Sequence, residues 1–278
     1  LALPPGLPER VSGLSAMGAR LYVLGAGTAL PRPSQGGRCY GPAGYVYEPH
    51  PGGALTLLDI GPGSVRQLGH LGLGLERIER VVLSHFHPDH CLDLFALTFA
   101  RRNPACAGLG ALEVLGPSGL SAWYEAGVGA LGEWVRDRRL TLVEQGPDAW
   151  AGGRRQGGFR LFARPTGHTP NALAWRIEPQ GPGGAWVYSG DSGERAELAE
   201  LARGADLFLC ECSFPDGRES EHHLTPGGAA RLARRAGVKR LLLTHFYPEL
   251  EPEQAAAAAG ASAGCPVAAA FDGLCVEL

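Results

Sequence analysis

Ser84-His85-Phe86-His87-Pro88-Asp89-His90 places three imidazoles and one carboxylate within six residues of this 278-residue chain. An apolar run over residues 78–83 precedes it and is typical of a buried strand. After it, Leu92, Phe95 and Phe99 recur on one face, which predicts a helix. Nitrogen and oxygen ligands at this density suit zinc or a similar transition metal. The stretch therefore predicts a metal site on a turn between a strand and a helix.

The spacing inside this stretch predicts ligands for two metal ions. His85 and His87 are two residues apart, so an extended backbone points both rings to the same side. Asp89 and His90 come after Pro88, where the chain bends toward the helix and can aim at a second point. The alternative is a solvated histidine-rich turn, which the partners found further along the chain disfavour.

The composition is that of a globular protein with a substantial core, with 45% hydrophobic residues, 19% charged residues and a net charge of −3. The mild acidity disfavours a wide nucleic-acid surface. No apolar run reaches the roughly 20 residues of a membrane span. The 7 cysteines are an odd number without a Cys-x-x-Cys pair, which indicates free thiols in a reducing cytoplasm. We therefore expect a cytoplasmic protein without a membrane segment.

Further metal-capable side chains follow other predicted strands. They are His168 after residues 159–163, Asp191 after residues 186–189, Glu211 after residues 207–210 and His245 after residues 240–243. Sites gather where strand ends converge in layered folds, so these residues are expected to meet the first stretch. Strands come first in each half and helices alternate with them later, which predicts two sheets packed face to face with helices outside.

These motifs resemble the metallo-β-lactamase superfamily and, more narrowly, its ribonuclease Z-like branch. His-x-His-x-Asp-His is followed by single His, Asp and His positions, and the match runs from about residue 18 to the C-terminus. The branch motifs occur in order as Gly-x-Gly-Thr-Ala-Leu-Pro (25–31), Gly-His-Thr (167–169), Tyr-Ser-Gly-Asp-Ser (188–192), Cys-Glu-Cys-Ser-Phe (210–214), His-Leu-Thr-Pro (223–226) and Leu-Leu-Thr-His-Phe (242–246). The combination is specific, whereas any single motif is weak.

The resemblance implies a four-layer αββα sandwich of the α/β (α+β) class, with two mixed β-sheets flanked by helices. It also implies two zinc ions, for which Mn²⁺ or Fe²⁺ are alternatives. One ion would be held by His85, His87 and His168, the other by Asp89, His90 and His245. Asp191 would bridge both ions. A water between two cations loses a proton near neutral pH and becomes the nucleophile.

Three residues are expected to be catalytic: Asp89, Glu211 and His223. Ester and lactam hydrolases of the superfamily generally lack the Glu211 and His223 pair, so the resemblance implies a phosphodiesterase. A histidine titrates near neutrality and can protonate a leaving alkoxide, while the glutamate fixes its tautomer. In the alternative arrangement, Glu211 pairs with an arginine and His223 caps the following helix.

The expected substrate is a small phosphodiester, cyclic nucleotides included. The tRNA-processing enzymes of the branch usually carry a basic arm between the single histidine and the bridging aspartate. About twenty residues separate His168 from Asp191 here, and the short motif reads Glu211-Cys212-Ser213 where those enzymes commonly have Glu-Ala-Thr. RNA is therefore the less favoured substrate. The alternatives are a tRNA 3′ endoribonuclease and a lactonase or thioesterase-type metallo-hydrolase on the same fold.

Two domain predictions complete the interpretation. Residues 1–16 are rich in Pro, Gly and Leu and precede Met17, the only methionine, so they are expected to be an N-terminal extension that is disordered or foreign to the native chain. Residues 17–278 are expected to form one metallo-β-lactamase-like domain, in which the Gly157-Gly158 region is a candidate boundary between two halves, although no domain linker is visible. A homodimer is left open.

Overall fold

A computed structural model describes residues 18–34, 36–146, 152–181, 183–218 and 220–278. The expected extension over residues 1–16 lies outside the described residues, so it stays a prediction. Within the described part of the chain, no helix is both long enough and apolar enough to cross a membrane. All seven cysteines are described, and each is a free thiol.

The first of two seven-stranded sheets takes its strands from the first half of the chain and from the C-terminus. The strands are β1 (Arg20–Gly25), β2 (Gly44–Glu48), β3 (Leu55–Ile60), β4 (Ile78–Val82), β5 (Leu112–Pro117), β6 (Leu140–Gln145) and β14 (Cys275–Glu277). Their order is β14-β1-β2-β3-β4-β5-β6. Strands β14 to β3 pair antiparallel and β3 to β6 pair parallel, so the sheet is mixed.

The second seven-stranded sheet has the corresponding organisation. Its strands are β7 (Arg154–Gln156), β8 (Phe159–Pro165), β9 (Leu173–Pro179), β10 (Trp186–Tyr188), β11 (Leu207–Glu211), β12 (Leu241–Thr244) and β13 (Val267–Ala269). The order is β13-β12-β11-β10-β9-β8-β7. Strands β7 to β10 pair antiparallel and β10 to β13 pair parallel.

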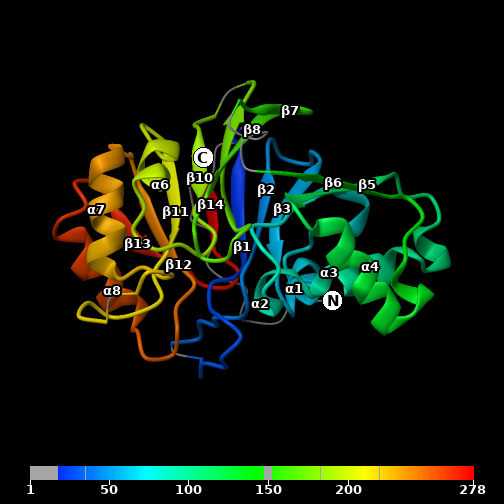
Figure 1. Cartoon of the computed structure of the whole chain (residues 1–278), viewed down its shortest axis with the longest axis horizontal. Helices are drawn as coiled ribbons and strands as arrows, with labels where there is room; N and C mark the ends of the chain where they lie inside the picture. The colour runs from blue at the N-terminus through cyan, green and yellow to red at the C-terminus, as the bar shows by residue number, and fades with distance from the viewer. Residues whose placement is uncertain (1–17, 35, 147–151, 182, 219) are drawn as a thin grey trace, which may run out of the picture.

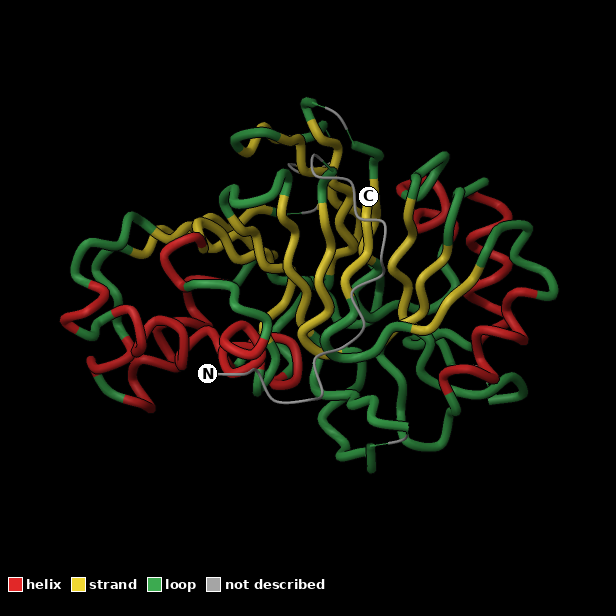
Figure 2. The backbone as a smooth tube through the Cα atoms, turned by 180° about the vertical axis from the view of Figure 1, so that it is seen from behind, coloured by secondary structure: helices red, strands yellow, loops and turns green. Residues whose placement is uncertain are grey.

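Helices cover the outer faces of both sheets (Figures 1 and 2). Beside the first sheet lie α1 (Ser64–His70), η1 (Leu75–Arg77), α2 (Pro88–Cys91), α3 (Asp93–Arg101), η2 (Pro104–Cys106), α4 (Leu120–Leu131) and η3 (Glu133–Val135). Beside the second lie α6 (Ala196–Leu201), α7 (Pro226–Ala236) and α8 (Pro252–Gly260). The predicted αββα sandwich of two mixed sheets is confirmed.

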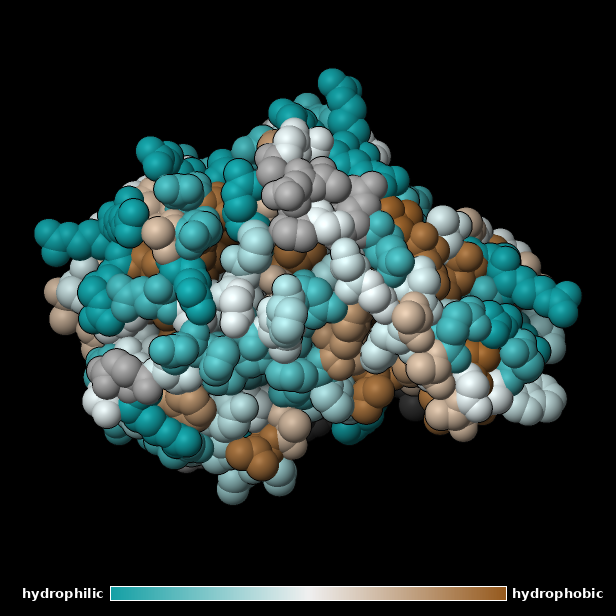
Figure 3. All heavy atoms as spheres, in the orientation of Figure 1, coloured by the Kyte–Doolittle hydropathy of each residue, from teal (hydrophilic) through white to brown (hydrophobic). Residues whose placement is uncertain are grey.

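Side chains alternate between two cores along the inner strands. On β2, Tyr45 and Tyr47 pack between the sheets, whereas Val46 packs under the helices of the first sheet. This follows from the two-residue period of a strand, and because both faces are covered, Tyr45, Val46 and Tyr47 are all hydrophobic. Hydrophilic residues cover much of the face shown in Figure 3. The large apolar side chains that stay exposed include Leu30, Leu92, Phe99, Leu131 and Trp134.

The predicted helix after the metal stretch forms, but its predicted buried face is wrong. Leu92 is 43% exposed and Phe99 is 56% exposed, while only Phe95 of the three is buried. The buried face of α3 also carries Thr98 and Arg101. Because these two residues are polar, the pattern of hydrophobic residues in the sequence does not reveal which face is buried. Arg101 tolerates burial because its Nε donates to Asp137 Oδ2 at 2.7 Å.

The predicted boundary at Gly157-Gly158 is also wrong. The chain passes to the second sheet between β6 and β7, and residues 157–158 form the tight turn between β7 and β8. Gly157 has a φ of 59°, which suits a turn glycine. The short strand β7 escaped prediction because its sequence, Arg154-Arg155-Gln156, lacks the apolar character that marks a strand.

Candidate metal centre

The predicted ligands converge at the strand ends next to α2, which carries Asp89 and His90 and is labelled in Figure 1. Four overlapping groups form there, and within each the potential ligand atoms lie within 4.8 Å of one another. Two of them are Asp59 with His85 and His90, and Asp191 with His223 and His245, and the other two match the sequence. Of these other two, the first contains His85, His87, His168 and Asp191, and the second contains Asp89, His90 and His245. They coincide with the two ligand sets that the sequence predicts, although their binding of metal stays a prediction.

Asp191 lies between the two groups. Its Oδ1 is 3.3 Å from His90 Nε2 and 3.4 Å from His245 Nε2. Its Oδ2 is 3.6 Å from His168 Nε2 and 3.9 Å from His85 Nε2. Each carboxylate oxygen therefore faces a different ligand set, which is the geometry that a bridging carboxylate needs.

Most of the rings in the cluster are held through Nδ1, which turns Nε2 inward. His168 Nδ1 donates to the carbonyl oxygen of His222 at 3.0 Å, and His90 Nδ1 lies 2.7 Å from Asp59 Oδ2. Hydroxyl groups hold two further rings, since His85 Nδ1 is 2.9 Å from Ser84 Oγ and His245 Nδ1 is 3.1 Å from Ser213 Oγ. Metal-binding histidines are typically oriented by such a hydrogen bond from the other ring nitrogen.

The inward-facing atoms fit a metal better than they fit one another. His90 Nε2 lies 3.2 Å from His245 Nε2, so two ring nitrogens of the same kind face each other. His85 Nε2 and Asp191 Oδ1 are buried and find no hydrogen-bond partner in the part of the chain that the structure describes. A buried lone pair without a donor is unfavourable, and a cation would satisfy it. Imidazole and carboxylate donors in this arrangement suit zinc.

Burial and neighbouring charges shift the pKa values of the cluster in different directions. Burial lowers the pKa of His85 well below its ordinary value, and the neighbouring His90 lowers it further. Burial likewise lowers the pKa of His168. Burial would raise the pKa of Asp191, but His245 and His90 hold it well below its usual range. Burial would lower the pKa of His90, but Asp191 and Asp59 raise it well above the ordinary value. Neutral imidazole and ionised carboxylate are the forms that ligate metals, so His90 would release its proton when a metal binds.

Sequence reasoning missed Asp59, which lies in β3. Its carboxylate accepts hydrogen bonds from Ser84 N at 2.7 Å, Ser84 Oγ at 2.6 Å and Tyr188 OH at 2.7 Å, and it also holds His90. Asp59 has a φ of 53°, an uncommon backbone conformation for a residue other than glycine. The available signal was an acid at the end of the apolar strand Leu55–Ile60, the same pattern that marked Asp191.

Asp59→Asn is expected to weaken metal binding about 10–100-fold, because an amide cannot accept all the hydrogen bonds that orient His90 and Ser84. The measurement is competitive zinc titration against a chelating dye. Asp216→Asn is the matched control, since Asp216 is exposed and accepts a hydrogen bond from Gly227 N. Equal zinc affinity for the two variants would contradict the orienting role of Asp59.

Glu211 and His223 form a pair beside the cluster. His223 Nδ1 lies 3.0 Å from Glu211 Oε1. Glu211 also accepts from Ser192 N at 2.8 Å and Leu224 N at 3.1 Å, so its orientation is fixed. Burial would lower the pKa of His223, but the hydrogen bond to Glu211 raises it. The alternative arrangement is not observed, because Thr225 caps α7 by accepting from Gly228 N at 3.2 Å.

A partly buried carboxylate, Asp272, holds the loop that follows β1 against the site. Asp272 Oδ1 accepts from Ala26 N at 3.0 Å, and Oδ2 accepts from Gly41 N at 2.8 Å. Within the loop, Ala29 N donates to Asp89 Oδ2 at 3.1 Å. The loop that contains the Gly-x-Gly-Thr motif (residues 25–28) thus contacts the second ligand set directly.

Asp272 provides a pH prediction for stability. Burial raises its pKa from 3.8 to about 6, although the two backbone N–H groups oppose this shift. The native chain then binds more protons at this carboxyl than the unfolded chain between roughly pH 4 and 6, so its contribution to stability falls as the pH rises through that window. The difference in unfolding free energy, wild type minus Asp272→Asn, should fall from pH 4 to 6 in urea titrations and stay level above. A constant or rising difference would contradict the prediction.

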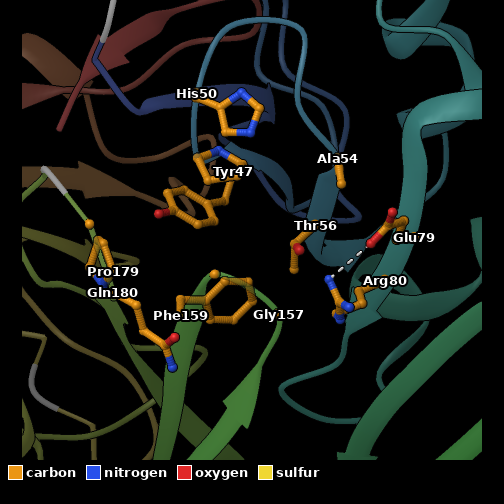
Figure 4. A pocket seen from close by; sticks show the side chains of 13 residues that line it. Tyr47, His50, Ala54, Thr56, Glu79, Arg80, Gly157, Phe159, Pro179 and Gln180 are labelled. Atoms are coloured by element: carbon orange, nitrogen blue, oxygen red, sulfur yellow. Dashed lines mark hydrogen bonds and ion pairs between the residues drawn. The ribbon is translucent and has the colours of Figure 1, made fainter.

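The cavity in Figure 4 is separate from the metal centre. It has a volume of about 450 Å³ and lies at the opposite end of the strands, where Tyr47, Phe159 and Pro179 line it. Arg80, whose guanidinium lines the cavity, already forms ion pairs: its Nη1 lies 3.3 Å from Glu79 Oε2 and its Nε lies 3.3 Å from Glu113 Oε2. We therefore place the chemistry at the histidine cluster.

Residues 56–246 match the Beta-lactamase superfamily domain. The chain belongs to this superfamily. An uncharacterized protein of Mycobacterium leprae is 36% identical over 202 residues, which cover 69% of this chain and 68% of that protein. Ribonuclease Z of Mycobacterium tuberculosis is 28% identical over 259 residues, covering 84% and 88%. The metallo-β-lactamase fold protein YhfI of Bacillus subtilis superposes with a TM-score of 0.80 at 23% identity, covering 94% and 100%.

The superfamily and the ribonuclease Z relative agree with the predicted class, a metal-dependent hydrolase of the metallo-β-lactamase fold with a His/Asp metal-binding cluster. The predicted resemblance and enzyme class are therefore confirmed.

Proposed function

We propose that the chain is a dizinc phosphodiesterase that cleaves small phosphodiesters, cyclic nucleotides among them. The observation that carries the proposal is the Glu211–His223 pair, 3.0 Å apart and adjacent to the histidine cluster. Hydrolysis of a phosphodiester with an alkoxide leaving group needs a proton donor, because an alkoxide is a strong base. A thioesterase has less need of this pair, since its leaving thiolate is less basic than an alkoxide.

Two ligand sets would hold the ions, with Mn²⁺ or Fe²⁺ as alternatives to zinc. His85, His87 and His168 form one set, Asp89, His90 and His245 form the other, and Asp191 would bridge them. When bound, the metals supply an activated water nucleophile and positive charge for the phosphate oxygens. Burial would raise the pKa of Asp89, but its contact with His245 and the nearby His90 keep it below the ordinary value, so it is available as an anion.

His223 would act as the general acid. Because its Nδ1 hydrogen-bonds to Glu211, its Nε2 carries the proton that can be donated. As the bond from phosphorus to the leaving oxygen breaks, this proton moves to the oxygen and leaves a neutral imidazole, which solvent protonates again. Glu211 favours the charged ring before transfer and keeps the tautomer fixed after it.

The short connection after the single histidine supports small substrates. Strands β9 and β10 form an antiparallel pair between His168 and Asp191, so this region holds a hairpin where the tRNA-processing enzymes usually carry an arm. The net charge of −3 is also unfavourable for a polyanion such as tRNA. A tRNA 3′ endoribonuclease is the second candidate, and the similarity to ribonuclease Z favours it. A homodimer and a cytoplasmic location stay predictions.

A hydrolysis panel with the purified, zinc-loaded protein tests the proposal. The panel contains bis-p-nitrophenyl phosphate, cyclic nucleotides, precursor tRNA and a set of lactones and thioesters, compared by kcat/KM. We expect the small phosphodiesters to be the best substrates. Site-specific tRNA cleavage at low enzyme concentration would favour the endoribonuclease, and a preference for lactones or thioesters would overturn the phosphodiesterase.

A further inference from the structure

Two aromatic side chains form a wall beside the proposed general acid. Phe214 and Tyr247, which we call the aromatic wall, have ring centroids 5.0 Å apart and an interplanar angle of 37°. Phe214 follows β11 and Tyr247 follows β12, so they extend from the strands that supply Glu211 and His245. Both rings are partly exposed, which leaves them accessible to a ligand.

The aromatic wall lies directly against His223. The His223 ring centroid is 5.5 Å from that of Phe214 and 5.8 Å from that of Tyr247. Tyr247 also lies 5.9 Å from the ring of His245, so the wall spans from the general acid to the metal cluster. If His223 protonates the leaving oxygen, the group attached to that oxygen must leave along this side of the site.

The charges around the aromatic wall are compensated. The guanidinium of Arg218 lies 4.0 Å over the Phe214 ring and also pairs with Glu249. A second phosphate group on a ligand would gain little binding energy from Arg218, because this cation is already paired. A neutral planar ring, in contrast, can stack on aromatic rings and on a guanidinium. The chemistry of this wall therefore suits an uncharged aromatic group.

The wall is also held in position before any ligand arrives. Arg32 Nη1 donates to the carbonyl oxygens of Tyr247 at 3.1 Å and Leu250 at 2.7 Å. Its Nη2 donates to Glu251 at 2.9 Å. These bonds tie the segment after β12 to the loop after β1, so little ordering is needed when a flat ligand binds.

We propose that the aromatic wall stacks the nucleobase of a nucleotide substrate. The inference rests on the proposed phosphodiesterase function and narrows its substrate class to nucleoside phosphodiesters. The phosphate would lie at the histidine cluster and the base against Phe214 and Tyr247. Base stacking on aromatic side chains tolerates different bases, so the wall would select for a base without selecting strongly among bases.

Calorimetric binding of two monophosphates to the zinc-loaded full chain tests the wall. Adenosine 5′-monophosphate and ribose 5-phosphate share the phosphate and sugar and differ in the base. We expect the wild type to bind the adenosine compound about 10–100-fold more tightly, the range typical of one stacked base. Phe214→Leu and Tyr247→Leu should each reduce this ratio, while Tyr247→Phe should keep it because the ring remains. Phe99→Leu, an exposed phenylalanine on α3, is the matched control.

The outcomes separate the two proposals. Equal affinity of the wild type for both compounds, or a ratio that survives both leucine substitutions, would overturn the aromatic wall while phosphate binding still supports a phosphodiesterase. Binding of neither compound, together with no phosphodiester hydrolysis in the substrate panel, would overturn the proposed function itself. Thermal melts of each variant verify that a lost ratio does not reflect a lost fold.

Discussion

Replacing His223 with alanine is expected to lower the turnover of a cyclic nucleotide about 10²–10⁴-fold, the contribution typical of a positioned general acid. The leaving group of this substrate is an alkoxide, which departs poorly without a proton. The side chain removed is hydrogen-bonded through Nδ1 to Glu211 and belongs to neither predicted ligand set. Steady-state kinetics at neutral pH measure the loss, and elemental analysis should still find two metals per chain.

His222→Ala provides the matched control for this prediction. His222 is the exposed neighbour of His223, and its hydrogen bond to His168 is made by the backbone carbonyl oxygen, which alanine retains. Its ring also lies edge-on to the ring of His168, with centroids 6.1 Å apart. Its replacement should change turnover less than about threefold, in line with an exposed substitution. Similar losses for His222→Ala and His223→Ala, or loss of a metal from His223→Ala, would contradict the general-acid role.

His85→Ala is expected to abolish detectable activity and to leave at most one tightly bound metal per chain. His85 is fully buried, and its Nε2 faces Asp191 Oδ2 at 3.9 Å. Without this ring, one ligand set loses one of its histidines and binds its metal ion more weakly. The remaining polar atoms of the set are then less well neutralised by the cation. Metal content after equilibration with zinc and gel filtration measures the effect. The rise in melting temperature on adding zinc should also be smaller than in the wild type, because weaker binding stabilises the native state less.

His50→Ala is the control for the metal prediction, since His50 is an exposed histidine beside the cavity at the far end of the strands. It should retain the wild-type metal content and zinc-dependent stabilisation. Two metals in His85→Ala would exclude this residue as a ligand. A wild-type stoichiometry of one under saturating zinc would contradict the two-ion arrangement.

The fold and the cluster were predictable because their signals are local. Each predicted ligand follows an apolar strand, and the alternation of His85 and His87 is visible in a few residues. The groups that orient the ligands are less visible, because their contacts join distant segments. Tyr188 reaches Asp59 across 129 positions, and Ser213 meets His245 across 32. Spacing along the chain cannot reveal such pairs, since they depend on how the two sheets pack.

The wrong prediction for α3 has a related cause. The pattern assumed that apolar residues mark the buried face, but Arg101 is buried and Phe99 is exposed. A buried guanidinium is acceptable only with a partner such as Asp137, and that partner lies 36 positions away. The aromatic wall escaped notice for the same reason, because Phe214 and Tyr247 come together only when β11 and β12 pair.

Leaving-group dependence tests the central claim most directly. A series of phosphodiesters with leaving groups from p-nitrophenolate to simple alkoxides is compared in the wild type and in His223→Ala, plotting log kcat/KM against the pKa of the leaving group. We predict a shallow line for the wild type and a steeper one for the variant. The two should lie close for p-nitrophenolate, which needs little protonation, and diverge as the leaving group becomes more basic. Parallel lines, with both metals retained in the variant, would contradict general-acid catalysis by His223.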